Sequence, residues 1–297
     1  MPVRARFWLL CGCTFFHFLA MGVFLSALPL FVSDELHGSK ATVGFAVGCF
    51  SLTAVVFRPW VGRRIDQLGR VWFLRLAPVL VAVTALGLLA AKVLGAVIAL
   101  RLLQGIAGAA FYTGAATVAT DLAPEEHRAE YISRFSLFLY AGFAAGPALG
   151  EALVGARGYA WAWSAAAASA VVAAGLASLL TETKLPEPAS DDGAALVSGA
   201  DSPPARRRWI HPTAVAPGMV LLTVAVGYTA ISSFAPLYAR SIGMGSSGGL
   251  YVTFALTILA VRLVSGRMAD RFGRTAVALP GLVSGAAGMF LIAAVAR

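Results

Sequence analysis

The feature that most constrains this chain is a charged motif that occurs twice, each time between two long apolar stretches. Residues 58–70 read RPWVGRRIDQLGR and residues 262–274 read RLVSGRMADRFGR. Charges this dense cannot lie in hydrocarbon, so both copies are predicted to be tight turns between membrane helices, with glycines that allow a sharp turn and close helix approach. The matching pairs, each 204 residues apart (262 minus 58), are Arg58 and Arg262, Gly62 and Gly266, Arg63 and Arg267, Asp66 and Asp270, Gly69 and Gly273, and Arg70 and Arg274.

The composition favours a polytopic membrane protein. Of 297 residues, 59% are hydrophobic and only 12% are charged, which exceeds the apolar content of a soluble domain. The formal charge of +9 is typical of basic cytoplasmic loops, and no basic face with interleaved aromatic residues predicts a nucleic-acid partner. All three cysteines lie within apolar stretches, so neither a metal site nor a disulfide framework is expected.

The lengths of the apolar stretches predict an all-α membrane protein with six helices in an amino-terminal half and three helices in a carboxy-terminal half. The halves are predicted at residues 1–181 and 212–297, joined by a disordered cytoplasmic linker over residues 182–211 that is rich in proline, serine and charge. Most Lys and Arg residues fall on one side if the amino terminus is cytoplasmic, which predicts that orientation in the cell membrane. The expected helices span residues 7–32, 41–61, 71–91, 93–120, 131–154, 160–180, 212–238, 250–265 and 275–296.

Three stretches resemble motifs of the major facilitator superfamily. The repeated charged motif resembles the family's GxxxDxxGR loop, which joins helices 2 and 3 and recurs between helices 8 and 9. RLLQGIAG at residues 101–108 resembles its helix-4 motif, and GFAAGPALGEAL at residues 142–153 resembles its helix-5 antiporter motif. The resemblance implies two six-helix halves around a cavity that opens alternately to each side, with both charged loops acting in cytoplasmic gating.

A buried arginine is the main candidate for proton coupling. Arg101 lies well inside the fourth predicted helix, where a charge is costly and must face protein or water. The resemblance implies that Arg101, together with Gln104, is linked to proton transfer. The alternative is an arginine paired only with buried backbone or with an acid.

The fifth predicted helix carries small residues at a spacing of four. Gly142, Gly146 and Gly150 would form one flat face for close packing, and Pro147 would permit a kink. Glu151 follows this face near the outer end of the helix, where it either faces water or takes part in coupling. In the first helix, His17 is expected to hydrogen-bond a neighbouring helix, with proton transfer as the alternative.

The function implied by these motifs is secondary active transport, namely proton-coupled efflux of an unidentified small molecule across the bilayer. No ATP-binding loop is present, so a proton gradient and no cofactor is expected to drive it. The alternative is a truncated or degenerate paralogue that inserts without transporting, because helices 10–12 are missing. A membrane enzyme is not expected, because HExxH is absent and GSSGG at residues 245–249 follows a helix, whereas a nucleophile elbow follows a strand.

The two charged loops are expected to find unequal partners. In the family, each loop aspartate lies near the cytoplasmic start of a helix in the other half, where exposed amides attract a carboxylate. Asp270 should therefore lie near the start of the fifth helix, at residues 131–134. Asp66 would lack its partner and be left to Arg63, Arg70 or water.

Overall fold

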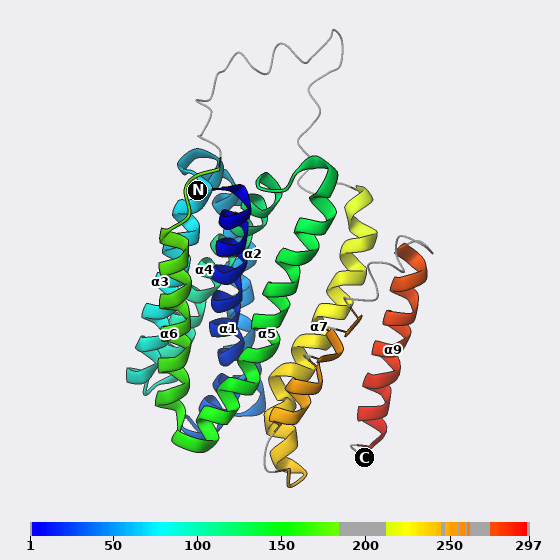
Figure 1. The fold of residues 1–297 in the computed structure, drawn as a ribbon. Coiled ribbons are helices and arrows are strands. Elements are labelled where there is room, and N and C mark those ends of the chain that lie inside the picture. Colours follow the sequence, from blue (N-terminus) through cyan, green and yellow to red (C-terminus); the bar gives the residue numbers. More distant parts are fainter. Residues whose placement is uncertain are drawn as a thin grey trace. The chain divides into compact units, whose positions relative to one another are not determined.

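The structure is a computed structural model that describes residues 2–183, 212–244, 247–254, 256–258, 260–261 and 274–295. The chain divides into two compact units. The first contains residues 1–185 and 232–266, and the second contains residues 186–231 and 267–297. The helices of Figure 1 are α1 (Val3–Asp34), α2 (Lys40–Leu68), α3 (Arg70–Gly87), α4 (Leu94–Asp121), α5 (Arg128–Arg157), α6 (Tyr159–Ser178), α7 (Pro212–Ser241) and α9 (Arg274–Val295).

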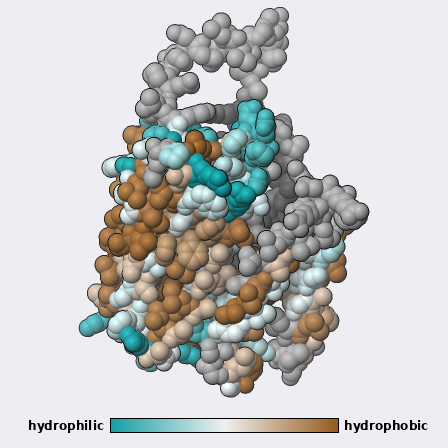
Figure 2. Space-filling model, in the orientation of Figure 1, coloured by the Kyte–Doolittle hydropathy of each residue, from teal (hydrophilic) through white to brown (hydrophobic). Residues whose placement is uncertain are grey.

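Six helices in the described part of the chain, α1 to α6, are long and apolar enough to cross a membrane. Two shorter apolar helical stretches follow at Gly248–Ile258 and Leu279–Leu291. Figure 2 shows apolar side chains covering the flank of the first unit and hydrophilic ones gathered towards its ends. This distribution fits a bilayer, whose core accepts only apolar side chains and internally hydrogen-bonded backbone. The predicted all-α membrane fold is confirmed.

Helix α1 is the centre of the first unit. It packs most extensively against α5 and then α6, while α2 packs on α4, and α3 on α4 and α6. Aromatic side chains of α1 pack against its neighbours. Phe24, for example, stacks on Trp163 of α6 with ring centroids 5.7 Å apart. Both rings are only 1% exposed. An almost wholly apolar sequence suits α1 because nearly every face of it meets another helix.

The interface between α1 and α5 is built from glycines. A Cβ atom on Gly146 would lie 2.5 Å from the Cα of Gly22 and 2.5 Å from the carbonyl oxygen of Leu19. A Cβ on Gly150 would lie 2.7 Å from Oγ of Ser26. Only hydrogen fits at these positions, so the two backbones come into direct contact, as small-residue faces allow in membranes. The close packing predicted for this face of the fifth helix is present.

Two further contacts complete this interface. Gly142 meets the backbone of Phe15, again with no room for a Cβ. Ser26 donates a hydrogen bond of 2.8 Å to the carbonyl oxygen of Pro147. Pro147 has no N–H group, so it makes no backbone hydrogen bond to the preceding turn of α5. Its Cδ also packs against α1, because a Cβ built on Gly22 would lie 2.9 Å from it.

The prediction that residues 58–70 form a tight turn is wrong. Helix α2 continues through the charged motif to Leu68, and one residue, Gly69, separates it from α3. The charges do not end the helix because arginine and glutamine are good helix formers and these side chains are exposed. The chain reverses at Gly69, whose φ of 90° favours glycine.

Other expectations lie partly outside the described residues. Of the linker predicted at residues 182–211, only Glu182 and Thr183 are described. The second charged motif lies outside them apart from Arg274, which begins α9. In the second unit, Gly227 of α7 lies against the side chain of Met289 of α9.

We expect Gly146→Leu to prevent normal packing of the first unit. The added side chain would overlap the backbone of α1, and such overpacking costs about 1–3 kcal/mol or more. Thermal unfolding and gel-filtration profiles in detergent should show a lower midpoint or aggregation, while membrane insertion persists. Gly155→Leu is the control, because Gly155 lies on the same helix, is exposed and has nothing within 4 Å. Equal stability of both variants would contradict the packing argument.

Candidate functional site: charged helix ends and a buried arginine

The first unit has two polar ends. At the loop end, α2, α4 and α6 finish and α3 and α5 begin. At the far end, α1, α3 and α5 finish and α2, α4 and α6 begin (Figure 1). The loop end carries the first charged motif, and the far end carries Asp34 and Glu151. Arg101 lies between the two ends, on α4.

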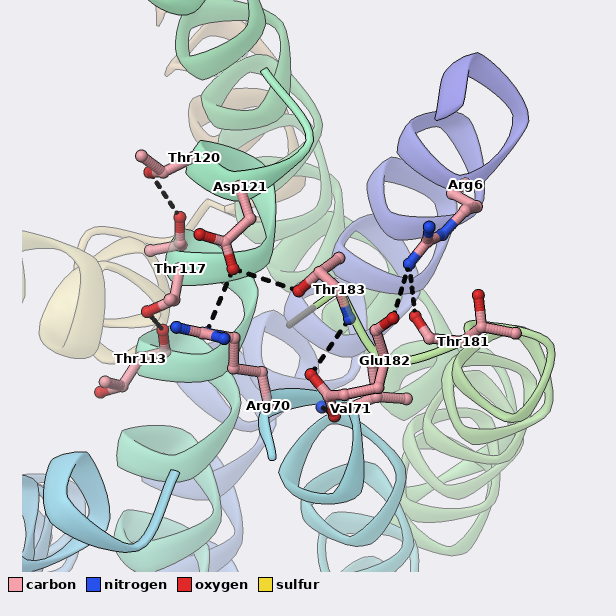
Figure 3. A network of polar contacts seen from close by, with 11 residues as sticks. Arg6, Arg70, Val71, Thr113, Thr117, Thr120, Asp121, Thr181, Glu182 and Thr183 are labelled. Atoms are coloured by element: carbon pink, nitrogen blue, oxygen red, sulfur yellow. Dashed lines mark hydrogen bonds and ion pairs between the residues drawn. The ribbon is translucent and has the colours of Figure 1, made fainter. Parts of the chain in front are cut away.

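At the loop end, Arg70 forms an ion pair with Asp121, the last residue of α4 (Figure 3). Nε of Arg70 lies 3.1 Å from Oδ2 of Asp121, and both side chains are less than one fifth exposed. Thr183 donates a hydrogen bond of 3.1 Å to the same carboxylate oxygen. The last residue of the charged motif is therefore tied to α4 and to the segment that follows α6.

Glu182 joins that segment to the start of α3. Its Oε2 accepts a hydrogen bond of 3.0 Å from the backbone N–H of Val71, one of the free amides in the first turn of α3 (Figure 3). The carboxylate also benefits from the positive end of the helix dipole. A Cβ on Gly69 would lie 2.5 Å from this oxygen. Gly69 is thus required both by its positive φ and by the space that Glu182 occupies.

Two arginines donate hydrogen bonds to carbonyl groups at the end of α6 and in the segment that follows it. Arg6 of α1 donates to the carbonyl oxygens of Thr181 and Glu182 at 2.7 and 3.1 Å. Arg75 of α3 donates to those of Ala177, Ser178 and Leu180, the shortest of these bonds being 2.6 Å. Cations at the carboxyl end of a helix also complement its dipole. Sequence reasoning missed Arg6, Arg75 and Glu182 as site residues, although charged residues at predicted helix ends were the available signal.

The other members of the first charged motif are less enclosed. Asp66 is exposed, and within the described residues it has no ion pair, while Arg70 pairs with Asp121. The guanidinium of Arg58 lies 5.4 Å from the ring centroid of Tyr112 on α4. Gly62 has nothing within 4 Å of a built Cβ, so the close helix approach predicted there is not found among the described residues.

Arg101 is buried between α2 and α4, with 6% of its surface exposed. It donates hydrogen bonds to the carbonyl oxygens of Ala46 and Val47 and, at 2.8 Å, to Oε1 of Gln104. Its guanidinium also lies 5.0 Å from the ring centroid of Phe50. Each of these partners is neutral, and the described residues place no carboxylate within ion-pair distance.

The helices around Arg101 are held close together. Gly105 lies against the backbone of α2, where a Cβ would overlap Phe50 and Thr53. Thr53 donates a hydrogen bond of 2.7 Å to the carbonyl oxygen of Leu102. The arginine therefore contacts carbonyl groups of α2 directly, and Gln104 is positioned one turn along α4 to accept from it.

Glu151 is partly buried near the end of α5. Its Oε1 accepts a hydrogen bond of 2.5 Å from the backbone N–H of Ser247, and its Oε2 accepts one from the Ser247 hydroxyl. Glu151 therefore binds protein rather than facing only water. Its role in coupling stays a prediction.

The expectation that His17 hydrogen-bonds a neighbouring helix is wrong. Both ring nitrogens are buried without a hydrogen-bond partner in the described part of the chain. The ring instead stacks on Phe111 of α4, with centroids 3.7 Å apart and planes 7° apart. Aromatic packing at this position replaces the polar contact that the sequence suggested.

The remaining site predictions fall where the structure is not described. Arg262, Gly266, Asp270 and Gly273 lie outside the described residues, as does the expected contact of Asp270 with the start of the fifth helix. Among the described side chains, no three of His, Cys, Asp or Glu gather into a group that could hold a metal ion.

Six apolar helices with charges confined to their ends, and one buried arginine, define a polytopic α-helical membrane protein. A family profile described as Major Facilitator Superfamily matches residues 10–296. The chain belongs to this family of transporters and is not an enzyme.

The chain is similar to a protein named for export and to one named for multidrug resistance. It is 26% identical over 262 residues to the staphylopine export protein of Staphylococcus aureus, covering 86% of this chain and 62% of that protein. It is 27% identical over 136 residues to multidrug resistance protein 1 of Bacillus subtilis, covering 46% of this chain and 35% of that one.

A solved structure with the same fold is a bacterial homologue of the human lysosomal transporter Spinster in an inward-facing, unoccupied conformation. The TM-score is 0.70 at 16% identity, over 92% of this chain and 64% of that one. The chain therefore spans about three fifths of the length of that structure and of the staphylopine export protein.

We expect Gly69→Ala to destabilise the loop end. Alanine at a φ of 90° costs about 1–2 kcal/mol, and its Cβ would also displace the Glu182 carboxylate from Val71. The midpoint of thermal unfolding in detergent should fall. Gly62→Ala, on the same charged motif but in open space, should be neutral or slightly stabilising. A Gly69→Ala protein as stable as Gly62→Ala would contradict this account.

Proposed function

We propose that the chain is a secondary active transporter that exports small molecules in exchange for protons, by alternating access. The proposal is supported by membership of the family and by relatives that are named for export and for multidrug resistance. No ATP-binding loop occurs in the sequence, so an ion gradient must supply the energy. The proposed partners are the lipid bilayer and an unidentified small molecule, with no cofactor.

The observation that carries the proton-coupled part is the environment of Arg101. Its guanidinium lies seven residues along α4, about 10 Å from the start of the helix at 1.5 Å per residue. A charge at such depth is costly, and the hydrogen-bond partners of Arg101 among the described residues are neutral. A cation of this kind favours the ionised form of any carboxyl group that approaches it, which promotes proton release. Gln104 positions the guanidinium, and Glu151 is a second candidate for coupling.

The proposed orientation places the loop end in the cytoplasm of the cell. Arg6, Arg70 and Arg75 lie at that end, together with the exposed Arg63 and Arg64. Cytoplasmic loops of membrane proteins carry such an excess of arginine and lysine. The amino terminus would then be cytoplasmic, and the far end would face outward.

We expect Arg101→Ala to abolish proton-driven export. Inverted membrane vesicles containing the 297-residue chain should accumulate ethidium or tetracycline when an inside-acid gradient is imposed, and a protonophore should stop the accumulation. Arg101→Ala should reduce the rate at least tenfold without loss of protein from the membrane, because it removes the cation that favours the ionised form of an approaching carboxyl group.

The matched control is Arg64→Ala, which removes an exposed arginine whose partners are Gln67 and the Trp60 ring. This variant should transport at nearly the parental rate. Unchanged export by Arg101→Ala would contradict the coupling role. A parental chain that inserts but moves neither compound would favour the alternative of an inserted, non-transporting protein.

A further inference from the structure

Two carboxylates at the far end join α1 and α5 to the carboxy-terminal segment of the first unit, residues 232–266. Asp34, the last residue of α1, forms an ion pair of 2.7 Å with Arg240 near the end of α7. Tyr159, the first residue of α6, donates a hydrogen bond of 2.6 Å to the same oxygen of Asp34. The side chains of Arg240 and Asp34 are 47% and 37% exposed, so water screens the pair.

The second contact is more enclosed. Ser247 is fully buried and precedes the apolar helix Gly248–Ile258, since its carbonyl oxygen accepts the N–H of Leu250 at 2.9 Å. Its own N–H and its hydroxyl both donate to Glu151 of α5, one to each carboxylate oxygen. The negative charge therefore lies at the amino end of that helix, where its dipole is positive. A carboxylate that accepts two hydrogen bonds is held more strongly than an exposed ion pair.

The two ends differ in what their polar contacts join. The loop-end contacts of Arg6, Arg70, Arg75 and Glu182 stay within residues 1–183. The contacts of Asp34 and Glu151 instead span 206 and 96 residues of sequence. Separation of Arg240 and Ser247 from α1 and α5 would therefore break their contacts with Asp34 and Glu151 and leave those loop-end contacts intact.

We propose that Asp34 with Arg240, and Glu151 with Ser247, form a two-part latch that closes the far end of the transporter and must release before that end opens. The proposal rests on the proposed alternating-access function and adds to it the residues that gate one side. These residues are positioning residues, because they set which state is populated without a defined contact to substrate. Their unequal strength means that the exposed Asp34 pair contributes a small part and the enclosed Glu151 contact the larger part.

The test measures distances across the far end in the full 297-residue chain, reconstituted in lipid nanodiscs. The native cysteines are all buried, and replacing Cys11, Cys13 and Cys49 by serine or alanine leaves introduced cysteines as the only labels. Spin labels at Lys40 and Ile242 report on the Asp34 contact, and labels at Ala156 and Leu250 report on the Glu151 contact. All four positions are exposed and lie outside the latch.

The parental chain should show mainly the short distance for both label pairs. Asp34→Asn should raise the long-distance fraction a few-fold, and Glu151→Ala should raise it about tenfold. The exchanged pair Asp34→Arg with Arg240→Asp should return the distribution toward that of the parent. This exchange separates loss of the ion pair from general damage to the fold.

Two matched controls are present at the same end. Glu35 is exposed, follows Asp34 directly and forms no ion pair among the described residues, so Glu35→Gln should leave the distances unchanged. Ser247→Ala removes one of the two hydrogen bonds to Glu151 and should raise the long-distance fraction. Its control is Ser241→Ala, because among the described residues Ser241 donates to the carbonyl oxygen of Tyr238 in its own helix, and this variant should leave the distances unchanged.

The outcomes separate the latch from the transport function. Longer distances in the latch variants support the latch even if the chain transports neither ethidium nor tetracycline, a result that would count against the proposed function alone. Unchanged distances in both Asp34→Asn and Glu151→Ala would overturn the latch, whatever the vesicle assay shows.

Discussion

Direct backbone contact between α1 and α5 is the interaction on which the rest of the first unit depends. Gly146 and Gly22 face each other where neither can carry a side chain, and Gly142 and Gly150 continue the contact in both directions. In a bilayer, water does not drive apolar surfaces of helices together, so dispersion between closely packed backbones supplies much of the association. This contact keeps α1 central, where its aromatic residues pack against α6.

The second constraint is the cost of polar groups in hydrocarbon. In this chain, polar groups find hydrogen-bond partners in two ways. At the loop end, Arg75 satisfies carbonyl groups at the end of α6, and Arg6 satisfies those of the segment after it. Glu182 satisfies an amide of α3. Within the bundle, Arg101 uses carbonyl groups of α2 that already take part in a helix. The first arrangement strengthens the fold, whereas the second leaves a cation with neutral partners and is the basis of the proposed coupling.

The contacts at the two ends suggest different roles in the proposed cycle. The loop-end network binds the amino-terminal helices to one another and to the segment after α6, and its contacts stay within residues 1–183. The far-end contacts join these helices to residues 232–266 through a few polar groups of limited strength. A gate needs contacts of this kind, because a state that is too stable would trap the transporter on one side.

The amino-acid sequence by itself determined the helical membrane fold, the burial of Arg101 and the glycine face of α5. These follow from local rules, since apolar length, the cost of a buried charge and the spacing of small residues need no knowledge of neighbouring helices. The tertiary structure decided which side chains contact one another. Only in the folded chain do Asp121 meet Arg70, Ser247 meet Glu151 and the ring of Phe111 cover His17. The end of α2 also depends on the tertiary structure. The exposed charged residues of the motif continue the helix to Leu68, and α2 ends at Gly69, where the backbone takes a positive φ.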